Sequence, residues 1–450
     1  MAKNAEINLR CLQNESKLII NSNYLSMEPL IVLILTLILI TVLAFSRRVP
    51  AFIVLIAGAI FLGLIAGFDL DQVLTWTAEG MGAIFSSFAI VILSGMVIAK
   101  LLSEQGLLEV IVSGIYGRIK NPAAGAGIIG FILSVPTTCC ITTYLMIAPA
   151  LKNPENESPG SNKLLYLVAV GSIISYVLIF PTPATMPLLT NLGAGYPAYL
   201  FNTVAIPLSL VILTVVILLS GMWYGKDGGC GYTREGLKKE YLLKMHLRAW
   251  TPFIAILAAV PVGVFLFNLS HLGLVQFIML AGLIAALVPA PRDLRMKGFS
   301  AGAKSAGLIL FDFCSAGAIG KVMIGSGLAG GIVESMIPFV PVILVPFLIA
   351  AVFATAQGSR VVTAVITSQI IGTTALVQEV HPVPLILMVS AGTCFIPYLT
   401  DPYFWLVQRT TGDDIRIVLR NYTLPLAFCG LIMLSAAILL AVTVCPAPVI

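Results

Sequence analysis

The sequence has few charged residues. Lys, Arg, Asp and Glu together make up 10% of its 450 residues, whereas about 25% is usual for soluble globular domains. Hydrophobic residues make up 59% of the chain, and the mean hydropathy is +1.03. This composition excludes a soluble domain. It predicts an all-α polytopic protein of the cell (plasma) membrane, in contact with the lipid bilayer.

Histidine and cysteine are too scattered to form a metal site or a disulfide framework. The three histidines, His246, His271 and His381, belong to no motif, and the eight cysteines include no CxxC pair. No cofactor is therefore expected. The sequence also lacks the motifs of intramembrane enzymes. It has no HExxH, no GxSxG motif with a partner histidine and no paired acidic motif for lipid phosphates, so we do not expect an enzyme. The net charge of +5 comes from basic residues in short loops, which is an orientation signal and not a nucleic-acid site.

Most of the chain consists of apolar runs long enough to cross a bilayer, which needs about 20 residues. We predict spans near 29–45, 51–67, 81–101, 164–189, 198–222, 250–267, 272–288, 305–321, 384–406 and 424–444. Two further segments, 123–150 and 340–376, are apolar but have polar residues in their middle. Residues 1–27 are predicted to be a polar N-terminal tail.

Lysine and arginine place the loops on alternating sides of the membrane, provided that the two segments with polar middles are re-entrant hairpins. Arg47 and Arg48 put the first loop inside, and the basic residues of 226–248 put the central loop inside. The basic residues of the N-terminal tail would then lie outside. We accept this conflict because a long tail is weaker evidence than a short loop.

Two helix breaks are the most informative features of the chain. Gln357, Gly358, Ser359 and Arg360 interrupt one apolar run, and Val135–Ile141 interrupts another about 220 residues earlier. Broken backbone at membrane depth persists only where protein or a water-filled cavity satisfies its polar groups. Polar residues at such places usually belong to a substrate or ion pathway.

The same offset relates other features. Lys100 pairs with Lys321, and Phe180–Pro183 pairs with Asp401–Phe404. Because proline removes an N–H donor, we predict that these proline-containing motifs, within 180–186 and 396–402, break a second helix in each half. Because the two hairpins enter from opposite sides, we predict two inverted repeats, 28–222 and 250–450. A basic cytoplasmic linker, 223–249, joins them. Inverted repeats with broken helices are typical of secondary transporters whose site lies at the repeat interface.

The breaks also supply candidate substrate-binding residues. A helix N-terminus exposes unpaired N–H groups and partial positive charge, and two such ends meeting at the midplane would bind a carboxylate. The candidates are Thr137, Thr138, Pro181, Thr182, Gln357, Gly358, Ser359, Arg360 and Thr400. The alternative for any one of the small residues among them is close helix packing.

Each of three charged residues at membrane depth has a functional and a structural interpretation. Arg360 either holds a substrate carboxylate or pairs with an acidic residue or snorkels. Asp401 is a candidate for proton coupling, because desolvation favours the neutral form of a carboxyl; its alternative is a helix cap. Asp312 is the second proton-coupling candidate, although pairing with Lys321 or Lys100 is the favoured interpretation.

Several motifs carry a family resemblance. They are Gly95–Gly106, Ile128–Pro136, Phe180–Pro187 with Asn191–Ala194, Ala356–Ser359 and Leu399–Leu406. Through them the chain resembles the gluconate:proton symporter (gluconate permease) family of the ion-transporter superfamily. The Asp-x-x-Phe-Trp and Pro-x-Pro elements are the most specific of these motifs.

The resemblance implies uptake of sugar-acid or related hydroxy-carboxylate anions with protons, by alternating access and often as a homodimer. The chain departs from the family pattern at Arg360, at Thr137–Cys140, and at Thr182, where a histidine is common. These positions lie where the substrate should bind, so the sequence does not distinguish gluconate from another small organic anion as the substrate. Coupling to sodium also stays open, although Asp401 favours protons, and a channel is the less favoured mode of transport.

Overall fold

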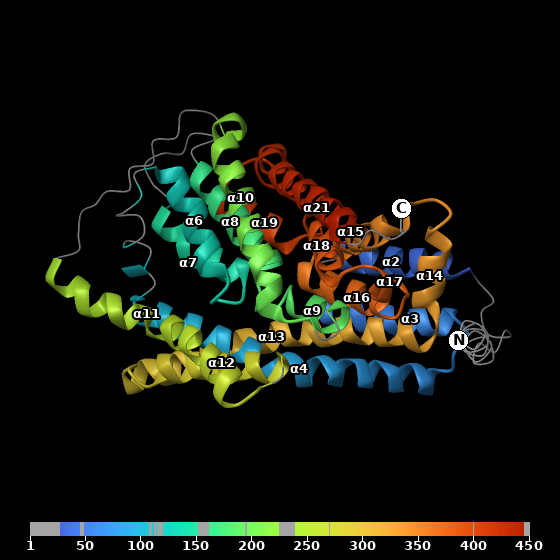
Figure 1. Cartoon of the computed structure of the whole chain (residues 1–450), viewed down its shortest axis with the longest axis horizontal. Coiled ribbons are helices and arrows are strands. Elements are labelled where there is room, and N and C mark those ends of the chain that lie inside the picture. Colours follow the sequence, from blue (N-terminus) through green and yellow to red (C-terminus); the bar gives the residue numbers. More distant parts are fainter. Residues whose placement is uncertain are drawn as a thin grey trace.

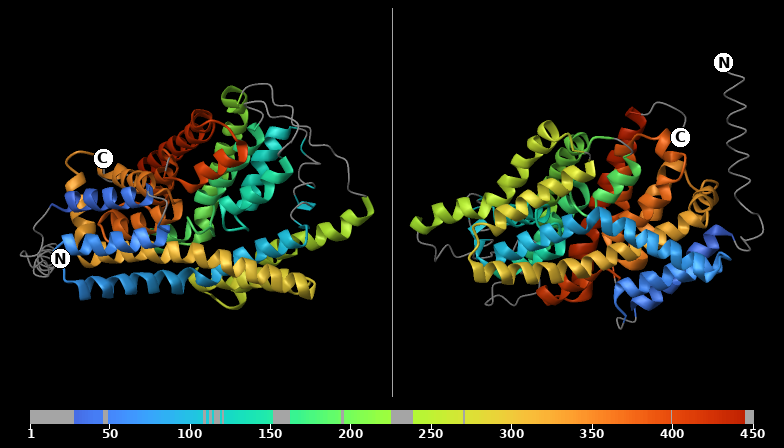
Figure 2. Two further views of the ribbon diagram at one scale, coloured as in Figure 1. Left: turned by 180° about the vertical axis from the view of Figure 1, so that it is seen from behind. Right: turned by 90° about the horizontal axis from the view of Figure 1, so that it is seen from below.

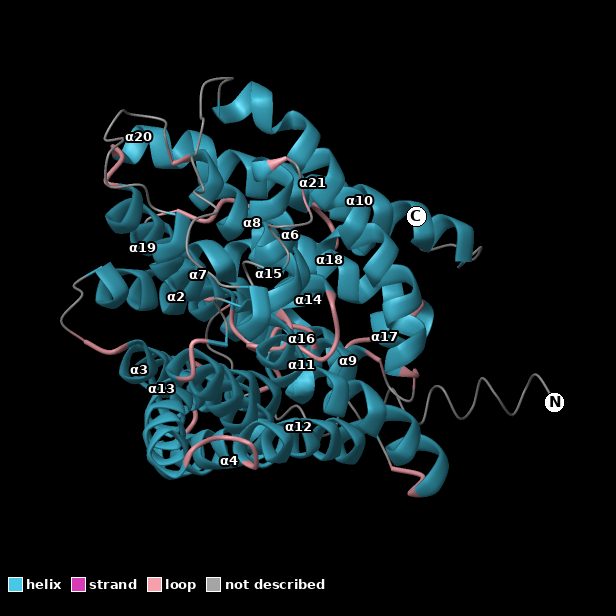
Figure 3. Ribbon diagram, turned by 90° about the vertical axis from the view of Figure 1, so that its left-hand side faces the viewer, coloured by secondary structure: helices cyan, strands magenta, loops and turns pink. Residues whose placement is uncertain are grey.

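The computed structural model describes residues 28–45, 49–107, 110–111, 114, 119, 121–151, 162–193, 196–224, 239–269, 271–398 and 400–444. These residues form helices and connecting turns, with no strand among them (Figure 3). The predicted all-α fold is confirmed. The N-terminal tail, Arg47 and Arg48, and residues 225–238 of the predicted linker lie outside the described residues.

Most of the helices follow the predicted apolar runs. In the first half they are α2 (Pro29–Phe45), α3 (Ala51–Ile65), α4 (Leu70–Glu104), α6 (Pro122–Ser134), α7 (Cys140–Leu151), α8 (Lys163–Leu178), α9 (Met186–Leu192) and α10 (Ala198–Tyr224). In the second half they are α11 (Lys239–Pro261), α12 (His271–Leu287), α13 (Arg292–Gly325), α14 (Leu328–Met336), α15 (Val345–Gln357), α16 (Arg360–Gly372), α17 (Leu376–Glu379), α18 (Pro382–Cys394), α19 (Pro402–Thr411), α20 (Ile415–Val418) and α21 (Leu424–Val444). Two π-helical turns, Val262–Leu266 and Leu419–Thr423, follow α11 and α20.

Five helical stretches in the described part of the chain are long and apolar enough to span a membrane. They are Leu70–Glu104, Ala198–Ser220, Arg248–Leu266, Arg292–Gly325 and Ile415–Thr443. Three of them begin well before the predicted span. The span predicted at 81–101 begins at Leu70, because Asp69 caps the helix by accepting a 3.1 Å hydrogen bond from the Gln72 N–H. The span predicted at 305–321 begins at Arg292, and the one predicted at 424–444 begins at Ile415.

The two apolar segments with polar residues in their middle, 123–150 and 340–376, each contain a helix break, as predicted. The first break separates α6 from α7, and Thr138 within it has a left-handed backbone with φ 52°. The second separates α15 from α16. Gly358 ends α15 with φ 72°, a conformation that glycine adopts at little cost, and Ser359 then caps α16. Two more breaks, between α8 and α9 and between α18 and α19, fall where the proline-containing motifs predicted them. Re-entry of the hairpins stays a prediction.

Helix bounds in the two halves correspond at the predicted offset. Adding 221 to the bounds of α4 gives 291–325, and α13 spans Arg292–Gly325. The same operation on α7 gives 361–372, and α16 spans Arg360–Gly372. This correspondence supports two repeats, and their inverted relation stays a prediction.

The long helices α4 and α13 run antiparallel, side by side, along the longest axis of the molecule (Figures 1 and 2). Glycines make this close approach possible. A Cβ on Gly80 would lie 2.3 Å from the Gly317 carbonyl oxygen, and one on Gly302 would lie 2.6 Å from the Cα of Val97. Larger side chains would force the helices apart, so this contact joins the two halves of the chain closely.

Candidate substrate site

A cavity of about 190 Å³ lies where the helix breaks meet α2, α3 and α13. Its apolar wall includes Ile40 and Val54. Its polar lining consists mainly of Gln357, Ser359, Arg360, Asp401 and Asp312, with the thiols of Cys139 and Cys140 and the phenol of Tyr176. Both halves of the chain therefore contribute to one site, which has charged groups in an apolar surrounding.

The two breaks of the second half hold each other in place. The Thr400 hydroxyl donates a 2.7 Å hydrogen bond to the Thr355 carbonyl oxygen. A Cβ on Gly358 would lie 2.1 Å from the Thr400 carbonyl oxygen, so only glycine permits this approach. As a result, the first residue of α16 and the N-cap residue of α19 lie against each other.

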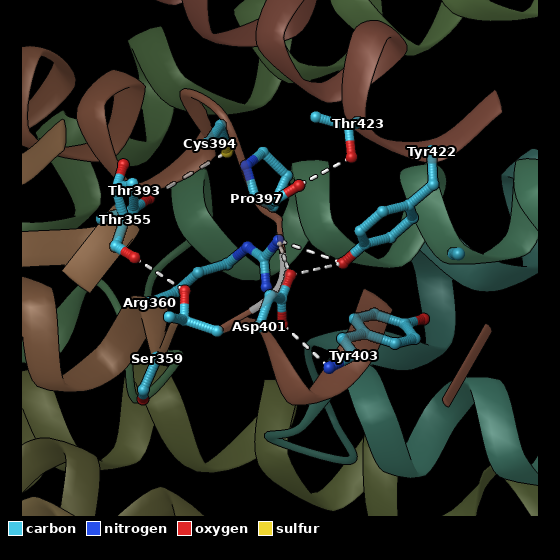
Figure 4. A network of polar contacts seen from close by, with 12 residues as sticks. Thr355, Ser359, Arg360, Thr393, Cys394, Pro397, Asp401, Tyr403, Tyr422 and Thr423 are labelled. Carbon is cyan, nitrogen blue, oxygen red and sulfur yellow. Dashed lines mark hydrogen bonds and ion pairs between the residues drawn. The ribbon is translucent and has the colours of Figure 1, made fainter. Parts of the chain in front are cut away.

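Those two residues form a buried ion pair (Figure 4). Arg360 Nη2 lies 3.0 Å from Asp401 Oδ2 and donates a second hydrogen bond, of 3.2 Å, to the Tyr422 hydroxyl. The Tyr422 hydroxyl donates to the same carboxylate oxygen at 2.8 Å, and the Tyr403 N–H donates to Asp401 Oδ1 at 2.8 Å. Arg360 is 7% exposed and Asp401 is 2% exposed. The pair is therefore almost completely desolvated.

The positive charge of Arg360 lies at a helix N-terminus, which is unusual. A helix N-terminus already carries partial positive charge, and a cation in the first turn is unfavourable there. Arg360 begins α16, and Asp401 caps α19, so the guanidinium and the N-terminus of α19 face the same carboxylate. Arg360 Nε is buried and has no hydrogen-bond partner among the described residues. The guanidinium and the N-terminus of α16 both lie at the cavity wall, and groups of these two kinds bind carboxylates.

The cavity lining includes six of the predicted site residues. Gln357, Gly358, Ser359, Arg360, Asp401 and Asp312 all contribute to it. Gln357 also holds the break in shape, because its Nε2 donates to the Ser359 carbonyl and to the Thr363 hydroxyl, each at 2.7 Å. Thr400 lies in an adjoining space of about 340 Å³, which shares Gln357 with the cavity and extends past Trp405 to Val49 and Arg409.

The other predicted residues lie outside the cavity lining. Thr137 donates a 2.8 Å hydrogen bond to the Leu133 carbonyl, and Thr182 donates a 2.6 Å bond to the Tyr176 carbonyl. Thr138 packs against Gly95 of α4. Pro181 belongs to the break between α8 and α9, next to Thr182. In this conformation the two bonded threonine hydroxyls satisfy backbone carbonyls at the breaks.

The predicted pairing of Asp312 with Lys321 or Lys100 is wrong. Lys321 binds Glu79 instead, at 3.1 Å, and both side chains are about half exposed. Within the described part of the chain, Asp312 has no lysine or arginine nitrogen within salt-bridge distance. Asp312 instead lines the cavity, where the backbone N–H of Phe52 donates to its carboxylate.

Tyr422 is the residue of the ion-pair cluster that sequence reasoning missed. It lies in the π-helical turn Leu419–Thr423, a rare conformation that often occurs at functional sites. Its sequence context, Asn421-Tyr-Thr423, gave only a weak signal, a short polar group at the start of the last apolar run.

Comparison with known proteins gives a consistent result. The sequence profile described as GntP family permease matches residues 28–226 and 274–443. An uncharacterized permease of Haemophilus influenzae is 26% identical, over 88% of this chain and 89% of its own length. The low-affinity gluconate transporter of Escherichia coli K12 is 21% identical, over 88% of this chain and 94% of its own. The crystal structure of the Alcanivorax borkumensis YdaH transporter has a similar fold, with a TM-score of 0.56 at 14% identity, covering 84% of this chain and 90% of that one.

Proposed function

Because this chain belongs to the GntP permease family, we propose that it takes up a small sugar-acid or hydroxy-carboxylate anion together with a proton. The chain is a multi-pass transporter of the cell membrane and not an enzyme. The observation that carries the proposal is the desolvated guanidinium of Arg360, which begins a broken helix at the wall of a cavity. The gluconate transporter among the similar proteins supports the substrate class.

Arg360 is the proposed binding group for the substrate carboxylate. A guanidinium has five N–H donors in one plane, and Asp401 and Tyr422 accept from Nη2 alone. Neither of these two bonds uses Nη1, and we assign that nitrogen to a substrate oxygen. Arg360 would then bind two carboxylates at once, that of Asp401 and that of the substrate. Gln357 and Ser359 lie beside it for hydrogen bonds to substrate hydroxyls.

The charges of the cavity favour a proton as the coupled ion. Arg360 contributes one positive charge, while Asp401 and Asp312 contribute two negative charges when both are ionised. An anionic substrate would add a third negative charge in a poorly solvated space, where repulsion between like charges is strong. A proton on either carboxyl removes one of these charges, so the anion and the proton favour each other's binding.

We further propose transport by alternating access between two inverted repeats. The adjoining space leads past Val49 and Arg409, toward the face that the basic loops assign to the cytoplasm. In this scheme the structure corresponds to an inward-facing state. The outward-facing state would arise by movement of the broken helices against α4 and α13. The homodimer stays a prediction.

Sodium coupling is the second candidate, and one observation favours it. The hydroxyl oxygens of Ser94, Ser134 and Thr138 are buried near the first break without a hydrogen-bond partner among the described residues. Oxygen atoms of this kind suit a hard cation. Their role would be decided by replacing the pH gradient with a sodium gradient in the assay that follows.

The proposal is tested by uptake of labelled gluconate, and of a panel of hydroxy acids, into proteoliposomes with an alkaline interior. We expect uphill uptake that a protonophore abolishes and that Arg360→Gln removes. The exposed Arg416→Gln, outside the cavity lining, is the matched arginine control, and we expect it to transport as the wild type does. Uptake that ignores the pH gradient but requires sodium would refute proton coupling. Full transport by Arg360→Gln would refute the binding role of Arg360.

A further inference from the structure

We propose that Asp312, and not Asp401, is the group that carries the proton through the transport cycle. This inference rests on the proposed proton-coupled function and makes it more specific. It follows from a comparison of what surrounds the two carboxyl groups at the cavity, and it gives Asp401 a different task, which is to position Arg360.

The carboxylate of Asp401 is fully engaged by its neighbours. Its carboxylate accepts three hydrogen bonds, from the guanidinium of Arg360, the hydroxyl of Tyr422 and the backbone N–H of Tyr403. The last of these places the carboxylate at the N-terminus of α19, where negative charge is favourable. A proton on Asp401 would weaken all of these contacts and leave the guanidinium buried without a counter-ion. Asp401 is therefore committed to holding Arg360 in place.

Asp312 has much weaker support for its charge. The backbone N–H of Phe52, in the first turn of α3, donates to it, and no ion pair joins it to any residue of the described ranges. Asp312 also lies eight residues after Lys304 and nine before Lys321, and the residues between these lysines carry no other charge. Since lysines at span ends reach the membrane surfaces, Asp312 lies near the centre of the span. A carboxyl at that depth without a counter-ion marks a functional position in a membrane protein.

The other groups that face the cavity do not neutralise Asp312. The α2 and α3 side presents apolar residues such as Ile40 and Val54. The break between α6 and α7 presents the thiols of Cys139 and Cys140, and α8 presents the phenol of Tyr176. Across the cavity, Arg360 is already paired with Asp401. A proton is thus the available partner for the Asp312 carboxylate.

The proposed coupling step changes only one covalent bond, an O–H bond of Asp312. A proton forms an O–H bond with one oxygen of the Asp312 carboxylate, and no other bond breaks. The loss of that negative charge admits the substrate carboxylate, which accepts a hydrogen bond from Arg360 while Arg360 keeps its bond to Asp401. After the substrate leaves, the Asp312 O–H bond breaks, and the proton passes to water at the inner mouth of the site.

Two transport assays separate a proton carrier from a substrate-binding group. One is net uptake driven by a pH gradient; a gradient of one unit sustains about tenfold accumulation when one proton accompanies one anion. The other is exchange of external labelled gluconate for internal unlabelled gluconate, without any gradient. We expect Asp312→Asn to lose accumulation, with a final ratio near one, and to retain exchange. We expect Asp312→Glu to retain both. The exposed Asp293→Asn, in the first turn of the same helix, is the matched control and should behave as the wild type.

The result for Asp401 completes the test. We expect Asp401→Asn to lose exchange and accumulation together, because Arg360 is no longer held for the substrate. Asp312→Asn with normal accumulation would overturn the inference. So would loss of exchange by an Asp312→Asn protein that unfolds at the wild-type temperature, because Asp312 would then bind substrate. Failure of the wild type itself to respond to the pH gradient would instead overturn the proposed function.

Discussion

Replacement of Arg360 by methionine tests the most unusual contact in the molecule. The change leaves the Asp401 carboxylate, which is 2% exposed, without its cation. Removal of one partner of a buried ion pair typically costs about 3–5 kcal/mol of folding free energy. Because Tyr422 and the Tyr403 N–H still donate to the carboxylate, we expect a loss near the lower end of that range.

The double variant Arg360→Met/Asp401→Leu tests whether the loss comes from the unpaired charge. Replacement of a whole buried ion pair by apolar residues is often neutral or stabilising. Asp401 also caps α19, and loss of a cap costs about 1 kcal/mol. We therefore expect the double variant to recover most of the stability that the single variant loses, and to fall about 1 kcal/mol below the wild type. Neither variant should transport gluconate.

Denaturant unfolding of the purified protein in detergent, with binding of labelled gluconate measured beside it, supplies both readouts. The exposed Arg416→Gln serves as control, and its stability should change by no more than about 0.5 kcal/mol. A single variant as stable as this control would show that the ion pair is not desolvated. A double variant that still binds gluconate would show that Arg360 does not bind the substrate.

Three further predictions concern stability and are checked by the same unfolding measurement. Gly358→Ala should lose at least about 1–2 kcal/mol, because a left-handed backbone is unfavourable for alanine; stability equal to the wild type would contradict the close contact of the two breaks. Gly80→Ala should lower the free energy of unfolding by about 1–3 kcal/mol, because its Cβ would meet the Gly317 carbonyl where α4 crosses α13. An unchanged denaturant midpoint of unfolding would contradict this close crossing. Lys321→Gln should cost no more than about 1 kcal/mol, because its pair with Glu79 is half exposed; a larger loss would mean that the pair is buried in the membrane.

Local sequence chemistry was enough to predict the helix breaks. Gly358 and Ser359 have the backbone and capping preferences that end one helix and begin the next, and the order Thr-Asp-Pro at 400–402 is that of a capped helix start. Asp401 is indeed such a cap, and it is also the partner of Arg360. Neither interpretation of Asp401 from sequence therefore included its main contact.

Contacts between distant segments could not be predicted in the same way. Tyr422 reaches Arg360 across 62 residues, and Lys321 reaches Glu79 from the other half of the chain. Hydropathy and propensity describe neighbours along the chain, whereas these partners are set by how helices pack. For this reason the sequence predicted Asp312 as a buried carboxyl but assigned it the wrong partner.

The antiparallel contact of α4 with α13 has a consequence for biosynthesis. About 190 residues lie between the end of α4 and the start of α13, so α4 enters the membrane well before its partner is made. Until then its glycine-containing face must be covered by lipid or by the insertion machinery. The first half of the chain therefore cannot complete its packing during its own synthesis, and the order of assembly is set by the appearance of α13.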